Sequence, residues 1–215
     1  ISKKVGIDKI AEVAFDFGLG QTFDISMPNQ KKGIVPSKEW KKNKMGESWY
    51  PGETLISAIG QGFVLTNPLQ LAVMTSIIAS DGKIIQPTIL KSNKSQFKVN
   101  SKYSKEIKII KEAMFKVVNE NRGTAFKSRL EDVKFAGKTG TSQVKRITLS
   151  ERESDEFRKK EQEWKNRDHA LFVGYMPYNN PKFSISVIIE HGGSGASTAA
   201  PIAKNIFNFL NSSKI

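Results

Sequence analysis

The 215-residue sequence contains no cysteine and only two histidines, His169 and His191. Without cysteine the chain can form neither disulfide bonds nor thiolate metal sites. Two histidines without clustered carboxylates make a weak metal site, so we expect both to pack at strand ends or in loops. The sequence therefore predicts no metal and no cofactor.

Long hydrophobic runs are also missing, because no apolar stretch approaches the length of a membrane-spanning helix. The opening residues, ISKKVGIDKI, show neither an initiator methionine nor the pattern of a signal peptide. We therefore expect the sequence to come from within a longer chain.

Acidic residues are fewer than basic ones, since 34 lysines and arginines against 21 aspartates and glutamates give a net charge of +13. Such a chain is attracted to nucleic acid, phospholipid headgroups or an acidic cell-wall polymer. A nucleic-acid platform would cluster its basic residues with aromatic ones, whereas these lysines are spread along the sequence. We therefore expect no nucleic-acid partner.

Hydrophobic periodicity predicts four helices in a chain of ordinary globular composition. The first covers residues 5–17, and the second, residues 67–80, begins with Asn67 as N-cap and Pro68 at its first position. The second should be buried, because it is apolar on nearly all sides. Residues 21–53 lie between them, have no period and predict a long ordered loop layer.

The third predicted helix starts at Ser104 as a cap and closes near Gly123. The fourth follows the HGGSG loop near the end of the chain. Each has a predicted apolar face, which comprises Ile107, Ile110, Met114 and Val117 in the third helix and Ile202, Ile206, Phe209 and Leu210 in the fourth.

Three strand patterns, residues 133–144, 169–176 and 183–190, follow one another without a crossover helix. This order favours an antiparallel sheet and an α+β fold. A shorter edge strand is expected within KIIQPTIL, and the highly charged residues 145–168 are expected to form a solvated excursion.

The strand FAGKTGTSQV has the composition of a binding edge. Lys138 supplies positive charge and Thr139 and Thr141 supply hydroxyl donors for an anion, while Gly137 and Gly140 leave the backbone accessible. An extended peptide can pair with such an edge, and a free N–H beyond Gly140 can face a developing oxyanion. These groups suit acyl transfer to a peptide that ends in a carboxylate, although an isolated K-T-G also occurs in ordinary exposed strands.

Three further segments accompany this motif: SAIGQGFVLTNPLQLA, NRGTAF and RDHALFVGYMPYNNPKFSISVIIEHGGSG. Together with K-T-G they resemble the elongation-type class B penicillin-binding proteins along nearly the whole chain. The resemblance implies a penicillin-binding/serine β-lactamase-like transpeptidase fold, which is α+β with helices packed on an antiparallel sheet. Asn29, Gln30, Glu53 and Asn67 depart from the family pattern, but they fall in or near loops.

The resemblance also implies an activity and residue roles. A D,D-transpeptidase uses an active-site serine to attack a D-Ala-D-Ala stem peptide during cell elongation, and penicillin is captured as a slow substrate. By position, Lys138 assists proton movement around the nucleophile, and the N–H of Thr141 stabilises the oxyanion. Thr139 and Thr141 would hold the substrate carboxylate, and Gly140 would keep the strand clear.

The partners implied by the resemblance are peptidoglycan stem peptides, β-lactams, a partner glycosyltransferase and proteins of the elongation complex. The implied location is the periplasmic face of the bacterial inner membrane, reached through an N-terminal anchor.

The nucleophile is the missing part, because a working S-x-x-K pair places serine at a helix start and lysine one turn later. None of the matches, which begin at Ser80, Ser95 and Ser142, falls on such a helix start. We therefore expect residues 1–215 to be the C-terminal part of one transpeptidase domain. The S-x-x-K and S-x-N motifs, outer strands and anchor should lie upstream, so the isolated chain should be inactive and should expose apolar surface.

Two alternatives stay open at this point. A serine β-lactamase or β-lactam sensor would share the fold and the K-T-G strand. A non-catalytic pseudoenzyme would use the same groove only to hold peptide.

Overall fold

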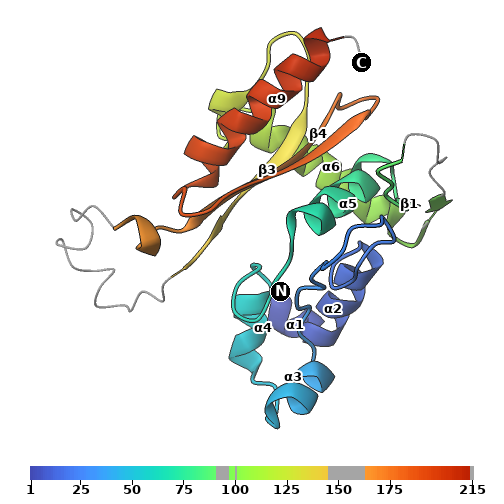
Figure 1. Cartoon of the computed structure of the whole chain (residues 1–215), viewed down its shortest axis with the longest axis vertical. Coiled ribbons are helices and arrows are strands. Elements are labelled where there is room, and N and C mark those ends of the chain that lie inside the picture. The colour runs from blue at the N-terminus through green and yellow to red at the C-terminus, as the bar shows by residue number, and fades with distance from the viewer. Residues whose placement is uncertain (91–96, 100, 145–162, 214–215) are drawn as a thin grey trace.

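The computed structural model describes residues 1–90, 97–99, 101–144 and 163–213 (Figure 1). Its centre is an antiparallel sheet of three strands in the order β3 (Ala136–Ser142), β4 (His169–Met176) and β5 (Phe183–Ile189). Helices pack on this sheet, so the predicted α+β class with an antiparallel sheet is confirmed. The predicted bounds of β4 are also confirmed, whereas β3 is shorter than expected at both ends.

The sheet has a helical layer on each face. On one face α9 (Ala200–Ser212) and the π-helical turn before it cover a core that includes Phe135, Phe172 and Phe207. On the other face α5 (Pro68–Ala79) and α6 (Ser104–Asn119) pack with Ala136 and Tyr175. Successive strand residues point to opposite faces, which explains how one strand serves both cores.

Helix α5 forms as its sequence predicts. The Gln70 amide donates to the side chain of its N-cap, Asn67, at 3.0 Å, and Pro68 occupies the first helical position. The side chain of Gln70 is fully buried, and its Nε2 donates to the carbonyls of Gln21 and Lys32. The helix is therefore buried as expected and also holds the preceding loop in place.

The expected loop layer over residues 21–53 is wrong in part, because α3 (Lys38–Met45) lies within it and α4 (Pro51–Ser57) begins within it. Ser37 caps α3 by accepting a hydrogen bond from the Trp40 amide, and Gly46 ends it at a φ of 71°. Lysines make up half of α3, so it lacks the hydrophobic period that marks an amphipathic helix.

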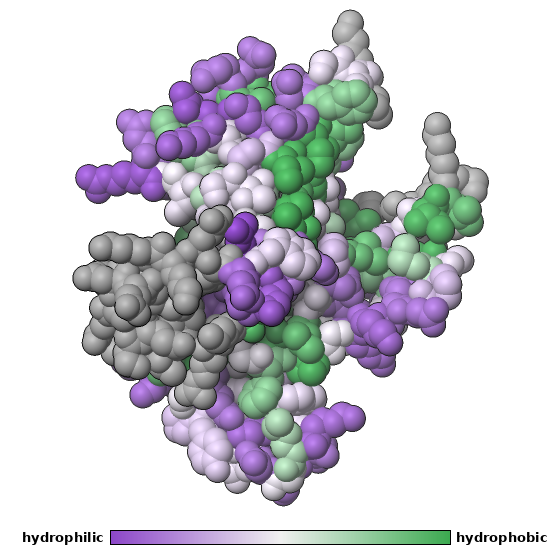
Figure 2. Space-filling view, turned by 60° about the vertical axis from the view of Figure 1, so that its left-hand side comes forward, coloured by the Kyte–Doolittle hydropathy of each residue, from purple (hydrophilic) through white to green (hydrophobic). Residues whose placement is uncertain are grey.

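Helix α9 buries a face other than the predicted one. Ala200, Ala203 and Phe207 are completely buried, whereas Ile202, Ile206 and Phe209 are 37%, 40% and 64% exposed. Small side chains let the helix approach the sheet closely, and this close approach outweighs the size of the apolar residues on the other side. Of the predicted set, Leu210 packs in part against the core. On the face drawn in Figure 2, hydrophobic side chains likewise reach the surface between hydrophilic ones.

Helix α6 also differs from its prediction at both ends and on its face. Its N-cap is Tyr103 and not Ser104, because a 3-10 turn leads directly into it, and it ends at Asn119. Ile107 is buried as predicted, but Ile110 is 40% exposed. Met114 is also buried as predicted, but the stripe continues to Val118, four residues later, while Val117 is only partly buried.

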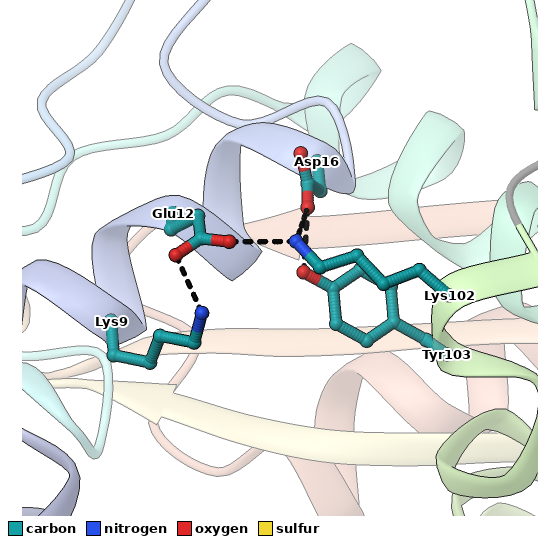
Figure 3. A network of polar contacts seen from close by, with 5 residues as sticks. All are labelled: Lys9, Glu12, Asp16, Lys102 and Tyr103. Carbon is teal, nitrogen blue, oxygen red and sulfur yellow. Dashed lines mark hydrogen bonds and ion pairs between the residues drawn. The ribbon is translucent and has the colours of Figure 1, made fainter.

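The N-terminal helices are tied to the start of α6 by a network of charges (Figure 3). Helix α1 (Ser2–Val5) leads into α2 (Ile7–Asp16). Lys102 Nζ lies 2.6 Å from Glu12 Oε1 and 3.1 Å from Asp16 Oδ2, and the Tyr103 hydroxyl donates to Asp16 Oδ2 at 2.6 Å. These bonds join segments that are about ninety residues apart in sequence.

A separate two-stranded antiparallel sheet pairs β1 (Lys83–Ile85) with β2 (Phe97–Val99), so the predicted strand in KIIQPTIL covers only three residues. Most of the charged excursion at 145–168 lies outside the described residues, and its last part contains a 3-10 turn at Trp164–Asn166. Within the described part of the chain, no helix is both long and apolar enough to cross a bilayer.

Candidate active site

Strand β3 carries the K-T-G residues along an edge that β4 does not cover. It pairs with β4 from Ala136 to Ser142, with Thr139 opposite Phe172 and Thr141 opposite Ala170. In the described structure β4 is the only strand paired with β3. The other edge of β3 is therefore available to a ligand as an unpaired strand edge.

The Lys138 ammonium lies at this edge. Side chains alternate along a strand, so Lys138 starts from the face opposite to Thr139 and Thr141. Its Nζ nevertheless donates to the Thr139 carbonyl at 2.5 Å, and the side chain is exposed. The positive charge is therefore held beside the threonines, where an anion at the edge would meet all three groups.

The Thr139 hydroxyl is held by a residue for which the sequence predicted no role. Thr139 Oγ1 lies 2.8 Å from Thr124 Oγ1, which belongs to the turn after α6. The segment NRGTAF was noted for its family pattern, but nothing local in it predicts this contact. Thr124 is therefore an addition to the site that only the structure provides.

The main chain of Thr141 faces the same edge. The Gln61 side chain donates through Nε2 to the Thr141 carbonyl at 3.1 Å, so this carbonyl points away from β4. In an antiparallel ladder the N–H and C=O of one residue point to the same side. The Thr141 N–H therefore also faces the free edge, as an oxyanion donor must.

Gln61 itself was missed as a site residue. It stands in the sequence between Gly60 and Gly62, which have φ values of 77° and 71° and form the turn after α4. The left-handed conformation of both glycines lets this turn reach the end of β3. The only signal in the sequence was the Gly-Gln-Gly pattern, which indicates a turn but not its neighbour.

The glycines of β3 have different roles from those expected. Gly137 is buried, and a Cβ there would lie 2.2 Å from the Phe172 ring, so it makes room for the core and not for a ligand. The backbone of Gly140 is covered by Gly195, where a Cβ would lie 2.3 Å from the carbonyl oxygens of Gly140 and Leu171. The HGGSG loop therefore forms a wall directly against the K-T-G strand.

The two histidines lie at a strand end and in a loop, as predicted, because His169 begins β4 and His191 begins the HGGSG loop. The His191 amide donates to His169 Nδ1 at 2.9 Å, and His191 Nδ1 lies 3.0 Å from the Arg167 carbonyl oxygen. The two rings meet edge to face at 4.8 Å. Among the described residues no group of three or more histidines, aspartates or glutamates could hold a metal ion.

The S-x-x-K matches are not assembled as nucleophiles where the structure describes them. Ser80 follows the last residue of α5, and its hydroxyl donates to the Ser76 carbonyl at 2.7 Å. Ser142 is the last residue of β3, while Ser95 lies outside the described residues. Neither described serine begins a helix with a lysine one turn later.

An antiparallel sheet with helices on both faces and an uncovered Lys-Thr-Gly edge is the architecture of penicillin-recognising serine enzymes. The chain belongs to the penicillin binding protein transpeptidase domain family, whose model matches residues 1–208. Within that family it is of the penicillin-binding protein 2 type.

Its relatives include two proteins named peptidoglycan D,D-transpeptidase MrdA. The one from Acinetobacter baumannii is 34% identical over 220 residues, which cover 97% of this chain and 32% of that protein. The one from Haemophilus influenzae is 31% identical over 221 residues, which cover 97% of this chain and 33% of that protein. The chain thus spans about a third of the length of the curated relatives it matches.

Solved structures give the same assignment. The penicillin-binding protein PBP2 of Helicobacter pylori, in a complex with MreC, superposes with a TM-score of 0.85 at 32% identity and covers 98% of this chain and 37% of its own. Pseudomonas aeruginosa PBP2, in complex with WCK 5153, gives a TM-score of 0.81 at 34% identity and covers 97% of this chain and 45% of its own. The predicted transpeptidase fold is therefore confirmed.

Proposed function

We propose that the chain supplies the K-T-G strand of a peptidoglycan D,D-transpeptidase that acts in cell elongation. The observation that carries this proposal is the convergence at one strand edge of the Lys138 ammonium, the Thr139 hydroxyl and the main chain of Thr141. An extended peptide that ends in a carboxylate can pair with this edge and place its charge beside the lysine and hydroxyls.

The proposed reaction has two acyl-transfer steps, and each step forms one acyl bond and breaks another. A serine attacks the carbonyl between the last two D-alanines, and the terminal D-Ala leaves with a proton. An amine of a neighbouring peptidoglycan strand then displaces the serine. Lys138 helps to move the proton around the serine, while the Thr141 N–H stabilises the negative oxygen. Removing one such oxyanion donor costs roughly 2.7–4 kcal/mol in another enzyme. Thr139 and Thr141 bind the carboxylate.

We also propose that the serine comes from a part of the transpeptidase domain upstream of these residues. The described S-x-x-K matches lie at a helix end and in a strand, and the matched relatives are about three times as long as this chain. Residues 1–215 would then be the C-terminal part of the domain, with S-x-x-K, S-x-N, the outer strands and a membrane anchor preceding them.

The proposed partners follow from the relatives. The Helicobacter pylori PBP2 structure contains MreC, and the structure of a peptidoglycan synthase complex that coordinates polymerization and crosslinking matches with a TM-score of 0.72 at 31% identity. We assign to this chain a partner glycosyltransferase, elongation-complex proteins, stem peptides and β-lactams. The corresponding location is the periplasmic face of the inner membrane.

The direct test is intact mass after incubation with benzylpenicillin, on this 215-residue chain and on a chain extended upstream along its natural reading frame. The proposal predicts a covalent adduct on the longer chain only. An adduct on the 215 residues would place the nucleophile within them and refute the upstream serine. No adduct on either chain would refute the enzyme and favour a peptide-binding pseudoenzyme.

A matched pair of variants of the longer chain tests the role of the strand. Lys138→Met should slow acylation by at least about a hundredfold, which is the size of a general acid–base contribution. Lys182→Met removes an exposed lysine in the turn between β4 and β5 and should leave the rate unchanged. Equal rates in both variants would remove Lys138 from the mechanism.

A further inference from the structure

Thr124 and Thr139 form a hydroxyl pair whose proton direction determines what the site can bind. Their Oγ1 atoms are 2.8 Å apart, and either hydroxyl can be the donor. Each threonine hydroxyl has one proton to donate and can accept two hydrogen bonds. If Thr139 is to donate to a carboxylate at the β3 edge, its bond with Thr124 must run in the direction Thr124 to Thr139.

The turn that holds Thr124 is fixed on both sides of it. The Gly123 amide donates to the Glu120 carbonyl at 2.8 Å, and the Ala125 amide donates to the Val117 carbonyl at 3.0 Å. The side chain of Ala125 is 1% exposed. A Cβ at Gly123 would lie 2.2 Å from the Val117 carbonyl oxygen, so the turn passes as close to α6 as a glycine allows.

A second contact fixes the same turn relative to the strand. The Asn119 side chain donates through Nδ2 to the carbonyls of Phe115 in α6 and Phe135 just before β3, both at 2.9 Å. The end of α6 and the start of β3 are therefore joined by hydrogen bonds close to Thr124. The threonine pair is thus held by the surrounding main chain, although Thr124 is exposed.

We infer that Thr124 is a positioning residue that directs the Thr139 hydroxyl proton toward the carboxylate of a ligand. The inference rests on the proposed function, which places that carboxylate at the β3 edge. By donating to Thr139, Thr124 occupies one acceptor position of its oxygen and leaves its proton free for the anion. A chain of two hydrogen bonds that ends on a charge also polarises both hydroxyls and strengthens each bond.

The test measures the preference for a carboxylate by NMR in the natural protein that contains this chain, labelled with ¹⁵N-threonine. The probes are acetyl-D-Ala-D-Ala and its C-terminal carboxamide, which differ in charge at one end. Their affinities are read from the amide signals of Thr139 and Thr141. The buried residues Thr54 and Thr75 report in the same spectra whether the fold is intact.

Three variants separate positioning from structure. Thr124→Val keeps the branched shape without the hydroxyl and should reduce the carboxylate-to-carboxamide affinity ratio about tenfold. Thr124→Ser keeps the hydroxyl and should stay within about twofold of the wild type. Thr66→Val is the matched control, because it also removes an exposed hydroxyl that is bonded to one side chain, Gln70, at 3.0 Å.

The inference is overturned if Thr124→Val keeps the wild-type ratio, or if the wild type has no preference for the carboxylate. Acylation of the wild type by benzylpenicillin is recorded in parallel. A Thr124-dependent carboxylate preference in a protein that is not acylated would support the inference while refuting the transpeptidase.

Discussion

The side-chain amide of Gln61 donates a hydrogen bond to the main-chain carbonyl of Thr141 at 3.1 Å, across 80 residues of sequence. This bond holds the main chain of Thr141 through its carbonyl, and the N–H of the same residue faces the free edge of β3. The Thr141 carbonyl oxygen has two lone pairs, so it can accept this bond and a second one from a ligand paired with the edge. The turn after α4 therefore helps to hold β3 in place.

Gln61→Leu in the longer chain should slow acylation by benzylpenicillin about five- to tenfold, because Thr141 loses a main-chain hydrogen bond that helps to hold its N–H toward the free edge. The second-order rate of adduct formation, followed by intact mass, measures the effect. Gln86→Leu is the matched control, because Gln86 is exposed and lies just after β1. An unchanged rate in Gln61→Leu would show that Thr141 is held without it.

Gly195→Ala should destabilise the protein by about 1–3 kcal/mol, which is the usual cost of forcing extra atoms into a packed site. The new Cβ would lie 2.3 Å from the carbonyl oxygens of Gly140 and Leu171, so the loop or the strand must shift. Urea unfolding measures the change. Gly52→Ala should have little effect, because a Cβ at Gly52 has no neighbour within 4 Å and its φ is not positive.

The Glu12 network should make stability fall in acid. Hydrogen bonds from Lys102 and then Lys9 lower the pKa of Glu12 from 4.5 to about 2. A lowered pKa means that the stabilisation is complete above pH 4.5 and is lost as the pH falls toward 2. The pKa of Asp16 is also lowered, chiefly by the Tyr103 hydroxyl, and adds to the loss in the same direction.

Glu12→Gln should therefore lower Tm at pH 7, and its difference from the wild type should shrink as the pH falls to 2. Thermal unfolding followed by circular dichroism between pH 2 and 7 measures this. Glu190→Gln changes an exposed carboxylate with no ion pair among the described residues. The plot of its Tm against pH should run parallel to that of the wild type. If the plot of Tm against pH for Glu12→Gln were also parallel to that of the wild type, the network would not contribute to stability as expected.

Lys41 should matter for stability far more than its neighbour in α3. It is 1% exposed, and its Nζ lies 2.6 Å from Glu53 Oε1, 3.3 Å from Glu47 Oε2 and 4.3 Å from the Tyr50 ring centroid. Burial lowers its pKa, but the hydrogen bonds with Glu53 and Glu47 outweigh burial and raise it overall. The buried ammonium is therefore charged and paired at neutral pH.

Lys41→Met should lower Tm by about 5–10 °C, because Glu53 loses its partner in a partly buried position. Differential scanning calorimetry measures the shift. Lys42→Met changes the next residue of the same helix, which is exposed, and should shift Tm by less than about 2 °C. Similar shifts for the two variants would argue against a specific role of the buried pair.

Local signals were sufficient for much of the fold. Asn67 and Pro68 predicted the start of α5, and the strand pattern at residues 169–176 gave the bounds of β4. The buried face of α9 was not predictable from hydrophobicity, because the helix packs through alanines and leaves Ile206 exposed. Helix α3 was missed because lysines hide its period, even though its cap, Ser37, was visible in the sequence.

The candidate site was likewise predictable only where its residues lie close together in the sequence. Lys138, Thr139 and Thr141 share one short motif, so a single stretch of sequence was enough to propose them as candidate site residues. Gln61 and Thr124 reach that motif only through the tertiary structure, from the turn after α4 and the turn after α6. No local pattern encodes such contacts, and the reason for Gly137, room for the Phe172 ring, also lies in packing between strands.

The wide separation in sequence of the groups around β3 has a kinetic consequence. The bond between Gln61 and Thr141 closes a loop of 80 residues, and Gly195 approaches Gly140 from near the other end of the chain. Non-local contacts of this kind form late, because the entropy of loop closure opposes them until the rest of the fold compensates. The assembled K-T-G edge is therefore a property of the completed fold, and partly folded forms on the way to it would lack that edge.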